Sequence, residues 1–248
     1  MLSSHSVRRW SLRVLVAILI VLLIAVVALL VWARTGLMQA EEAPWETVRS
    51  DPNLSVHEDD TAIVLRPAQD EPAGMGLAFY PGAKVEATAY ASRLPGVVAQ
   101  GGMTVVIIKP WLDLALFDRR DLDTFTQQAP EIGSWIVGGH SLGGVRACQL
   151  AGDADALLLG SYCASDVAGD IPALSLSGSE DGLSTPQKIA EAADRLPEQA
   201  RTVEIDGANH AGFGDYGPQD GDGRAVISDE EMAEAVTSHT LDFAETLG

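Results

Sequence analysis

Short apolar runs alternate with stretches of helical pattern along most of the chain after residue 60. The apolar and β-branched runs predict strands over residues 62–65, 76–80, 104–109, 135–138, 156–159, 173–177 and 201–205. The stretches between them predict helices over residues 86–100, 118–128, 143–150, 186–196 and 228–247, with Pro95 interrupting the first. This alternation predicts an α/β domain with a mostly parallel sheet and helices on both faces. In such a sheet, functional residues lie at the carboxyl ends of the strands.

A longer apolar run lies near the N-terminus. From Val14 to Ala33 the sequence has 20 consecutive apolar residues, which as a helix would cross the roughly 30 Å hydrocarbon core of a bilayer. The alternative is a cleaved secretory signal, whose apolar region would span only about 7–15 residues. Met38-Gln39-Ala40 is also a poor match to a cleavage site. We therefore expect an uncleaved, single-pass transmembrane helix over residues 12–33.

Arginines flank this apolar run unequally. Three precede it, whereas only Arg34 follows it closely. By the positive-inside rule, the N-terminus is expected in the cytoplasm and the rest of the chain on the extracytoplasmic side. The expected organisation is a cytoplasmic tail over residues 1–11, the transmembrane helix over residues 12–33, a linker over residues 34–60 and one α/β domain over residues 61–248.

The charge and cysteine content exclude several kinds of partner. The chain has 35 acidic and 16 basic residues, a net charge of −19, so we expect no binding to nucleic acid, whose phosphates this surface repels. Cys148 and Cys163 have no spacing typical of a zinc site, and we expect neither a metal nor a cofactor. The two cysteines are expected to be buried thiols, with a single disulfide as the alternative if the domain is extracytoplasmic.

The first chemical motif follows the strand predicted at residues 135–138. The segment Gly139-His140-Ser141-Leu142-Gly143 fits the pattern G-x-S-x-G, in which a serine occupies a sharp turn from strand to helix. Glycines two residues to either side leave space for the turn, and the following helix directs its N-terminal dipole at the serine. A plain turn with a capping serine is the alternative. We expect Ser141 to be a catalytic nucleophile.

A serine hydroxyl needs a base, and the chain has five histidines. His210 is the one that lies in a loop directly after a predicted strand, so it is the expected base, whereas His140 is expected to pack beside the turn. An acid should accept the imidazole N–H and stabilise the imidazolium. Asp181 follows the strand at residues 173–177 and is the expected acid, with Glu180 as the alternative.

Two backbone amides should hold the oxyanion that forms during acyl transfer. One is the amide of Leu142, the residue after the nucleophile. The other should come from the loop after the strand at residues 76–80, where we expect the amide of Ala83 to serve.

Five segments carry a resemblance to a known family: FYPGAKVEATAYA (79–91), TVVIIKPWLDLALFD (104–118), VGGHSLGG (137–144), SGSEDGLSTPQKI (177–189) and GANHAGFGDYGPQDGDG (207–223). They resemble the α/β-hydrolases of the fold-5 type, small single-domain hydrolases that are distantly similar to dienelactone hydrolases. The resemblance implies the α/β-hydrolase fold and a triad of Ser141, Asp181 and His210. Dienelactone hydrolases proper have a cysteine nucleophile, whereas this chain has a serine.

These observations together predict a membrane-anchored serine hydrolase that cleaves a small-molecule carboxylic ester through an acyl-enzyme. Thioester or amide cleavage by the same triad is one alternative, and a non-catalytic membrane-anchored binding domain of the same fold is another. The connection between the strands ending at residue 159 and beginning at residue 173 is too short for a cap of two or more helices. We therefore expect no cap domain.

Overall fold

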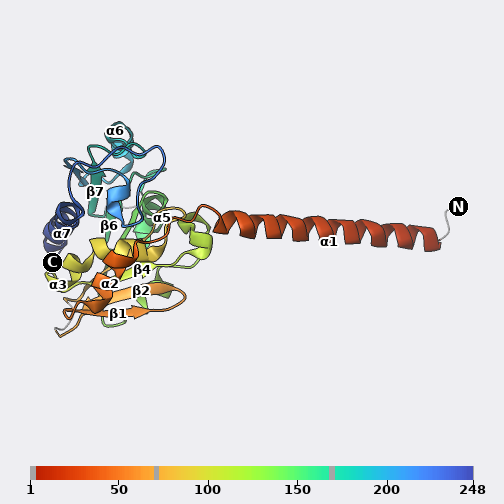
Figure 1. Ribbon diagram of the computed structural model, residues 1–248, viewed down its shortest axis with the longest axis horizontal. Helices are drawn as coiled ribbons and strands as arrows, with labels where there is room; N and C mark the ends of the chain where they lie inside the picture. The colour runs from red at the N-terminus through yellow and green to blue at the C-terminus, as the bar shows by residue number, and fades with distance from the viewer. Residues whose placement is uncertain (1–3, 70–72, 168–170, 248) are drawn as a thin grey trace. The chain divides into compact units, whose positions relative to one another are not determined.

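The computed structural model describes residues 4–69, 73–167 and 171–247, and the chain divides into two compact units, Met1–Leu37 and Met38–Gly248. The first unit holds helix α1 (Ser4–Arg34), which contains the predicted span (Figure 1). Within α1, the 26 residues Arg9–Arg34 form a helix that is long and apolar enough to cross a membrane. A signal sequence near an N-terminus has the same physical properties.

The second unit is built on an eight-stranded sheet in the order β1-β2-β4-β3-β5-β6-β7-β8. Strand β2 pairs antiparallel with β1 and β4, and every pair from β4 to β8 is parallel, which confirms the expected mostly parallel sheet. The strands are β1 (Leu54–Glu58), β2 (Ala62–Pro67), β3 (Met75–Tyr80), β4 (Thr104–Ile108), β5 (Ser134–His140), β6 (Ala156–Gly160), β7 (Ala173–Gly178) and β8 (Arg201–Ile205).

Helices pack on both faces of this sheet, as expected, and each face has its own hydrophobic core. In β4, Val105 and Ile107 belong to one cluster with buried residues of α2, α3 and α7, whereas Val106 and Ile108 belong to another with buried residues of α4 and α5. Successive side chains of a strand point to opposite faces, so a strand covered on both faces is apolar at nearly every position. The helices are α2 (Glu42–Ser50), α3 (Pro95–Ala99), α4 (Asp123–Thr126), α5 (Leu142–Leu150), α6 (Pro186–Ala192) and α7 (Asp229–Glu245).

The linker expected over residues 34–60 contains regular structure, because α2 and β1 lie within it. Pro44 lies in the first turn of α2, where the missing N–H leaves no intrahelical hydrogen bond unmade. In β1, Leu54 and Val56 pack against the core while their neighbours are exposed, as is typical of an edge strand with one buried face. From Met38 onward, the segment expected to be a linker belongs to the second compact unit.

Two of the predicted helices differ from those observed. The helix expected over residues 86–100 is a 3₁₀ helix, η1 (Ala87–Arg93), followed by α3, with Pro95 at the start of α3. The helix expected over residues 118–128 is reduced to α4. Asp118 is buried and accepts a hydrogen bond from the Arg120 backbone N–H at 3.0 Å, so a side-chain turn replaces the first helical turn. Helix α7 begins with a capping box of Ser228 and Glu231.

A disulfide joins Cys148 of α5 to Cys163 in the loop after β6, with their Cα atoms 5.8 Å apart. The expectation of two buried thiols was wrong, and the alternative of a single disulfide is the one observed. The bond attaches the loop after β6 to α5, the helix that follows the serine turn. The described residues of the connection from β6 to β7, namely 161–167 and 171–172, form neither helix nor strand.

Candidate active site

Ser141 joins β5 to α5 at the predicted sharp turn, with φ 53° and ψ −126°. This backbone conformation is costly for a residue other than glycine and is typical of functional sites. The flanking glycines are required by close contacts of the backbone. A Cβ atom on Gly139 would lie 2.4 Å from the backbone carbon of Gly143, and one on Gly143 would lie 2.1 Å from the Tyr80 carbonyl oxygen.

His210 and Asp181 are paired in the loops that follow β8 and β7. The Nδ1 atom of His210 lies 2.8 Å from Oδ2 of Asp181, and both side chains are buried. The other oxygen of Asp181 accepts backbone N–H bonds from Leu183 at 2.8 Å and Ser184 at 2.6 Å. Because the carboxylate accepts the hydrogen on Nδ1, Nε2 of His210 has a free lone pair and can act as a base. Glu180, the alternative acid, is exposed, and the bond that it accepts comes from Ser179.

His140 packs beside the serine turn, between the turn and His210. Its ring centroid lies 4.3 Å from that of His210 and 5.1 Å from that of Phe213, and its Nδ1 atom lies 2.9 Å from the Tyr90 hydroxyl. Burial and the neighbouring His210 hold the pKa of His140 well below its usual range, so this imidazole is neutral. The contact with His140 places the His210 ring against the residue that precedes Ser141.

The loop after β3 runs beside the serine, since a Cβ atom on Gly82 would lie 3.5 Å from Cβ of Ser141. Two of its amides are engaged: that of Gly82 donates to the Tyr90 hydroxyl at 3.0 Å, and that of Lys84 donates to the Asp113 carbonyl at 2.7 Å. Among the residues that the structure describes, the amides of Ala83 and Leu142 donate to no protein acceptor. Both remain available to an oxygen atom of a ligand.

Backbone strain is concentrated around this site. In the described part of the chain, the non-glycine residues with positive φ are Ser141, Lys84, Leu112 and Asp113, at 53°, 55°, 57° and 55°. The bond from the Lys84 N–H to the Asp113 carbonyl joins the loops after β3 and β4, so two of these residues meet in one contact and Leu112 precedes one of them in the chain. The strain at Leu112 and Asp113 was not predicted from the sequence, since leucine rarely adopts a left-handed conformation and aspartate does so only occasionally.

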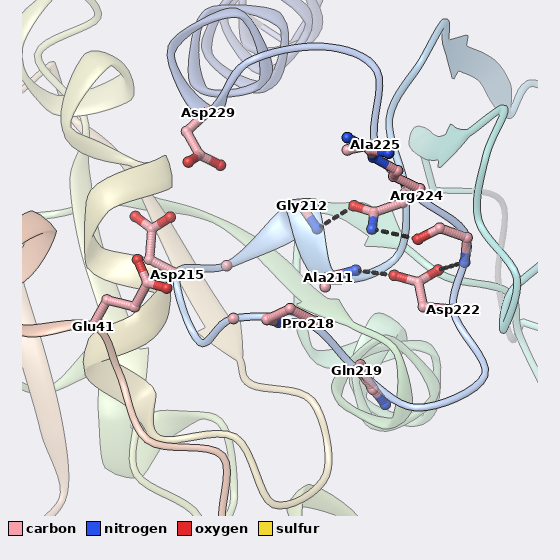
Figure 2. A pocket seen from close by; sticks show the side chains of 14 residues that line it. Glu41, Ala211, Gly212, Asp215, Pro218, Gln219, Asp222, Arg224, Ala225 and Asp229 are labelled. Atoms are coloured by element: carbon pink, nitrogen blue, oxygen red, sulfur yellow. Dashed lines mark hydrogen bonds between the residues drawn. The ribbon is translucent and has the colours of Figure 1, made fainter.

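Two polar side chains in the last loop were also missed by the sequence analysis. Asp222 accepts hydrogen bonds from the backbone of His210 and Ala211, the second of which is drawn in Figure 2, and Asn209 donates one to the Gly223 carbonyl. Both lie within the 207–223 segment that carries the family resemblance, but no local pattern assigns them a partner. Their bonds join positions that are distant along the chain.

A cavity of about 390 Å³ lies beside this loop and has four acidic residues in its wall (Figure 2). Asp215 and Asp229 form ion pairs with the buried Arg93, and Asp222 accepts hydrogen bonds from backbone amides. Glu41 is the fourth acidic residue of the wall. Within the described ranges, no group of three or more histidine, cysteine or acidic side chains is arranged to hold a metal ion. Ser141 does not line this cavity.

Solved structures with a similar fold come from several organisms. TT1662 from Thermus thermophilus is 14% identical, with a TM-score of 0.55, over 78% of this chain and 98% of that one. The esterase domain of a Rhodothermus marinus protein is 14% identical, with a TM-score of 0.54, over 79% and 98%. Est1E from Butyrivibrio proteoclasticus is 12% identical, with a TM-score of 0.50, over 78% and 99%. At these identities the likeness shows the fold alone.

The sequence itself identifies the family. No curated protein sequence matches the chain significantly. The model of the alpha/beta hydrolase family, by contrast, matches residues 76–234, which is more than half of the chain and includes β3 through the start of α7. The matched region contains the serine turn, the His210–Asp181 pair and the loop after β3. The chain therefore belongs to the alpha/beta hydrolase family.

Proposed function

We propose that the chain is a membrane-anchored serine hydrolase that cleaves carboxylic esters through an acyl-enzyme. The observation that carries the proposal is the buried pair of His210 and Asp181, 2.8 Å apart, beside the strained turn at Ser141. A backbone conformation of this cost persists where it exposes a reactive group, and a buried carboxylate–imidazole pair makes that group nucleophilic.

The proposed reaction has two stages. His210 Nε2 takes the proton of the Ser141 hydroxyl as its oxygen attacks the ester carbonyl, and Asp181 stabilises the imidazolium. The amides of Leu142 and Ala83 hold the oxyanion, and the imidazolium then gives its proton to the leaving alcohol. In the second stage a water molecule, deprotonated by His210, attacks the acyl-enzyme and releases the carboxylic acid.

The description of one structural relative favours an ester over a thioester or an amide as the substrate. One of the solved structures with this fold is described as an esterase domain. The rival proposal is a binding domain without turnover. It gives no account of why an acid–base pair stays buried beside a strained serine, since such a pair costs free energy when it serves no reaction.

Two features support anchoring and an extracytoplasmic domain. Helix α1 has the length and composition of a membrane span, and the arginines before it outnumber those after it. The disulfide between Cys148 and Cys163 is of a kind that persists in oxidising compartments and is rare in the cytosol.

Labelling with a fluorophosphonate probe tests the proposed nucleophile. The full-length protein in detergent should be labelled and should hydrolyse nitrophenyl acetate, whereas folded Ser141→Ala should be neither labelled nor active. Labelling of Ser141→Ala equal to that of the wild type would overturn the assignment. Turnover of thioester or amide analogues at a higher kcat/KM than the esters would favour the alternative substrates.

The same assay tests the proposed acid. Asp181→Asn should lose about 10³- to 10⁴-fold in kcat, because the imidazole loses its orienting carboxylate. Glu180→Gln is the matched control and should keep nearly all activity, because Glu180 is exposed and makes no contact with His210. Loss of activity in Glu180→Gln with retention in Asp181→Asn would assign the role of the triad acid to Glu180.

A further inference from the structure

We infer that Asp222 is a positioning residue that fixes the His210 loop against the Asp181 loop. The inference rests on the proposed function, since it names a further residue on which the geometry of that triad depends. Asp222 makes no contact with the hydroxyl of Ser141 in the structure and is assigned no proton-transfer role.

The carboxylate of Asp222 accepts hydrogen bonds from backbone amides of three separate segments. Its Oδ2 atom accepts from Ala211 at 2.8 Å, a bond drawn in Figure 2. Its Oδ1 atom accepts from His210 at 3.1 Å, from Gly182 at 3.0 Å and from its own neighbour Gly223 at 2.7 Å. One oxygen atom thus joins the backbone of the proposed base to the residue that follows the proposed acid.

The backbone around Asp222 is shaped to bring its carboxylate to this place. A Cβ atom on Gly223 would lie 1.8 Å from the Glu180 carbonyl oxygen, and one on Gly182 would lie 2.6 Å from the Gly221 carbonyl oxygen. Gly221 has a φ of 85°. The segment 221–223 therefore packs directly on the loop that carries Asp181, and this close approach requires glycine on both sides.

Asn209 reinforces the same loop from within. Its Oδ1 atom accepts the Gly212 N–H at 2.9 Å, and its Nδ2 atom donates to the Gly223 carbonyl at 2.9 Å. Three hydrogen bonds therefore join the His210 loop to the 221–223 segment. The N–H groups of His210 and Ala211 donate to Asp222, and the Asn209 side chain donates to the Gly223 carbonyl. The imidazole is carried by a backbone that has two external supports rather than by a free loop.

A carboxylate suits this position better than an amide. Both oxygens of aspartate accept hydrogen bonds, and bonds to an ionised acceptor are about twice as strong as neutral ones. Asparagine can keep the three bonds to Oδ1, but its NH₂ group would face the Ala211 N–H, donor against donor. Alanine removes every bond and leaves four amides without this acceptor.

Catalysis depends on such support because a shift of about 1 Å in a reacting group can cost about 10²-fold in rate. In the full-length protein, Asp222→Ala should lower kcat on nitrophenyl acetate about 10²-fold and change KM by less than about 3-fold. Asp222→Asn should lie between Asp222→Ala and the wild type. Asp220→Asn is the matched control, because Asp220 is exposed, carries the same charge and lies two residues away. It should behave as the wild type does.

A second readout does not depend on turnover. An imidazole N–H bonded to a carboxylate gives a far-downfield proton resonance, which should be present in the wild type and in Ser141→Ala. Asp222→Ala should broaden or abolish it, whereas Asp220→Asn should keep it. An inactive wild type would count against the proposed function while this resonance still tests the inference. The inference that Asp222 positions His210 would be overturned if folded Asp222→Ala kept both the resonance and the wild-type kcat. If Asp222→Ala fails to fold, a wild-type resonance and kcat in Asp222→Asn would overturn the inference instead.

Discussion

Single side chains connect the serine turn to the loop that faces it. Burial raises the pKa of the Tyr90 hydroxyl, so this hydroxyl stays protonated. Burial lowers the pKa of His140, so this imidazole stays neutral. Tyr90 therefore accepts the Gly82 N–H and donates to His140 Nδ1. The Gly82 amide is held toward Tyr90, which leaves the next amide, that of Ala83, as the donor used in the proposed mechanism.

The neutral state of His140 should make folding sensitive to acid. In the unfolded chain this imidazole has a pKa near 6.5, whereas in the folded protein its pKa lies well below that value. The unfolded state therefore binds more protons as the pH falls through 6.5, and the free energy of unfolding decreases. The loss should be about 1 kcal/mol between pH 6.5 and 5.5.

Urea unfolding of wild type and His140→Gln at these two pH values measures this contribution. His140→Gln should be the less stable protein at pH 6.5, because it disturbs the bond to Tyr90, and the difference should narrow at pH 5.5. All other ionisable groups are common to both proteins. Parallel pH dependences would show that His140 binds a proton in the folded state.

Local signals were sufficient for most of the candidate site. Ser141, Asp181 and His210 each follow a strand of the parallel part of the sheet, and the structure brings these three segments to one edge of the sheet. Asp222 could not be predicted in the same way, because its partners lie 11, 12 and 40 positions away. A hydrogen bond between two loops depends on how both loops pack, and the local sequence of one loop does not specify that packing.

At the scale of elements, buried strands were predictable and marginal helices were not. A parallel strand covered on both faces appears as a continuous apolar run, so β4 and its neighbours were found with ends shifted by only a few residues. Helix α4 is short because Asp118 and Arg120 bond to each other and to backbone in place of continuing a helix. Side-chain bonds of this kind override a weak helical pattern.

The disulfide between α5 and the loop after β6 should contribute measurably to stability. It closes a loop with a sequence separation of 15 residues, for which the chain-entropy model gives roughly 3 kcal/mol. Reduction with dithiothreitol should therefore lower the urea midpoint of the wild type. The double variant Cys148→Ser with Cys163→Ser should start lower and show no response to reductant, and an equal response of both proteins would refute the contribution.

The short connection from β6 to β7 also bears on substrate size. With no cap helix in its described residues, little apolar surface covers an acyl chain, and each unburied methylene forfeits about 0.8 kcal/mol of binding. Trp111 and Phe117, in the loop after β4, are 59% and 54% exposed and offer a limited apolar surface. We expect the highest kcat/KM on short acyl esters. A steady rise from two to sixteen carbons on nitrophenyl esters would contradict this and point to a lipase.

At the scale of the whole molecule, an acidic chain follows an apolar helix that has arginines before it. All 35 acidic residues of the chain lie after that helix, at or beyond Glu41, where only 12 of the 16 basic residues accompany them. Such a domain is repelled by anionic lipid headgroups, so the helix rather than the surface of the domain would have to supply membrane attachment. The sequence analysis began the α/β domain at residue 61, whereas the second compact unit of the structure begins at Met38.

The orientation of the anchor can be tested with a pair of reporters fused after Gly248. A reporter that works only outside the cytoplasm should be active, and one that works only in the cytoplasm should be inactive, because the positive-inside rule assigns the side of Arg8, Arg9 and Arg13 to the cytoplasm. The fusion should remain with the membrane fraction at full length. Replacing these three arginines by glutamine should weaken the preference, whereas replacing Arg34 should not. Activity of the cytoplasmic reporter would overturn the orientation, and a shortened, soluble fusion would show that the helix is a cleaved signal.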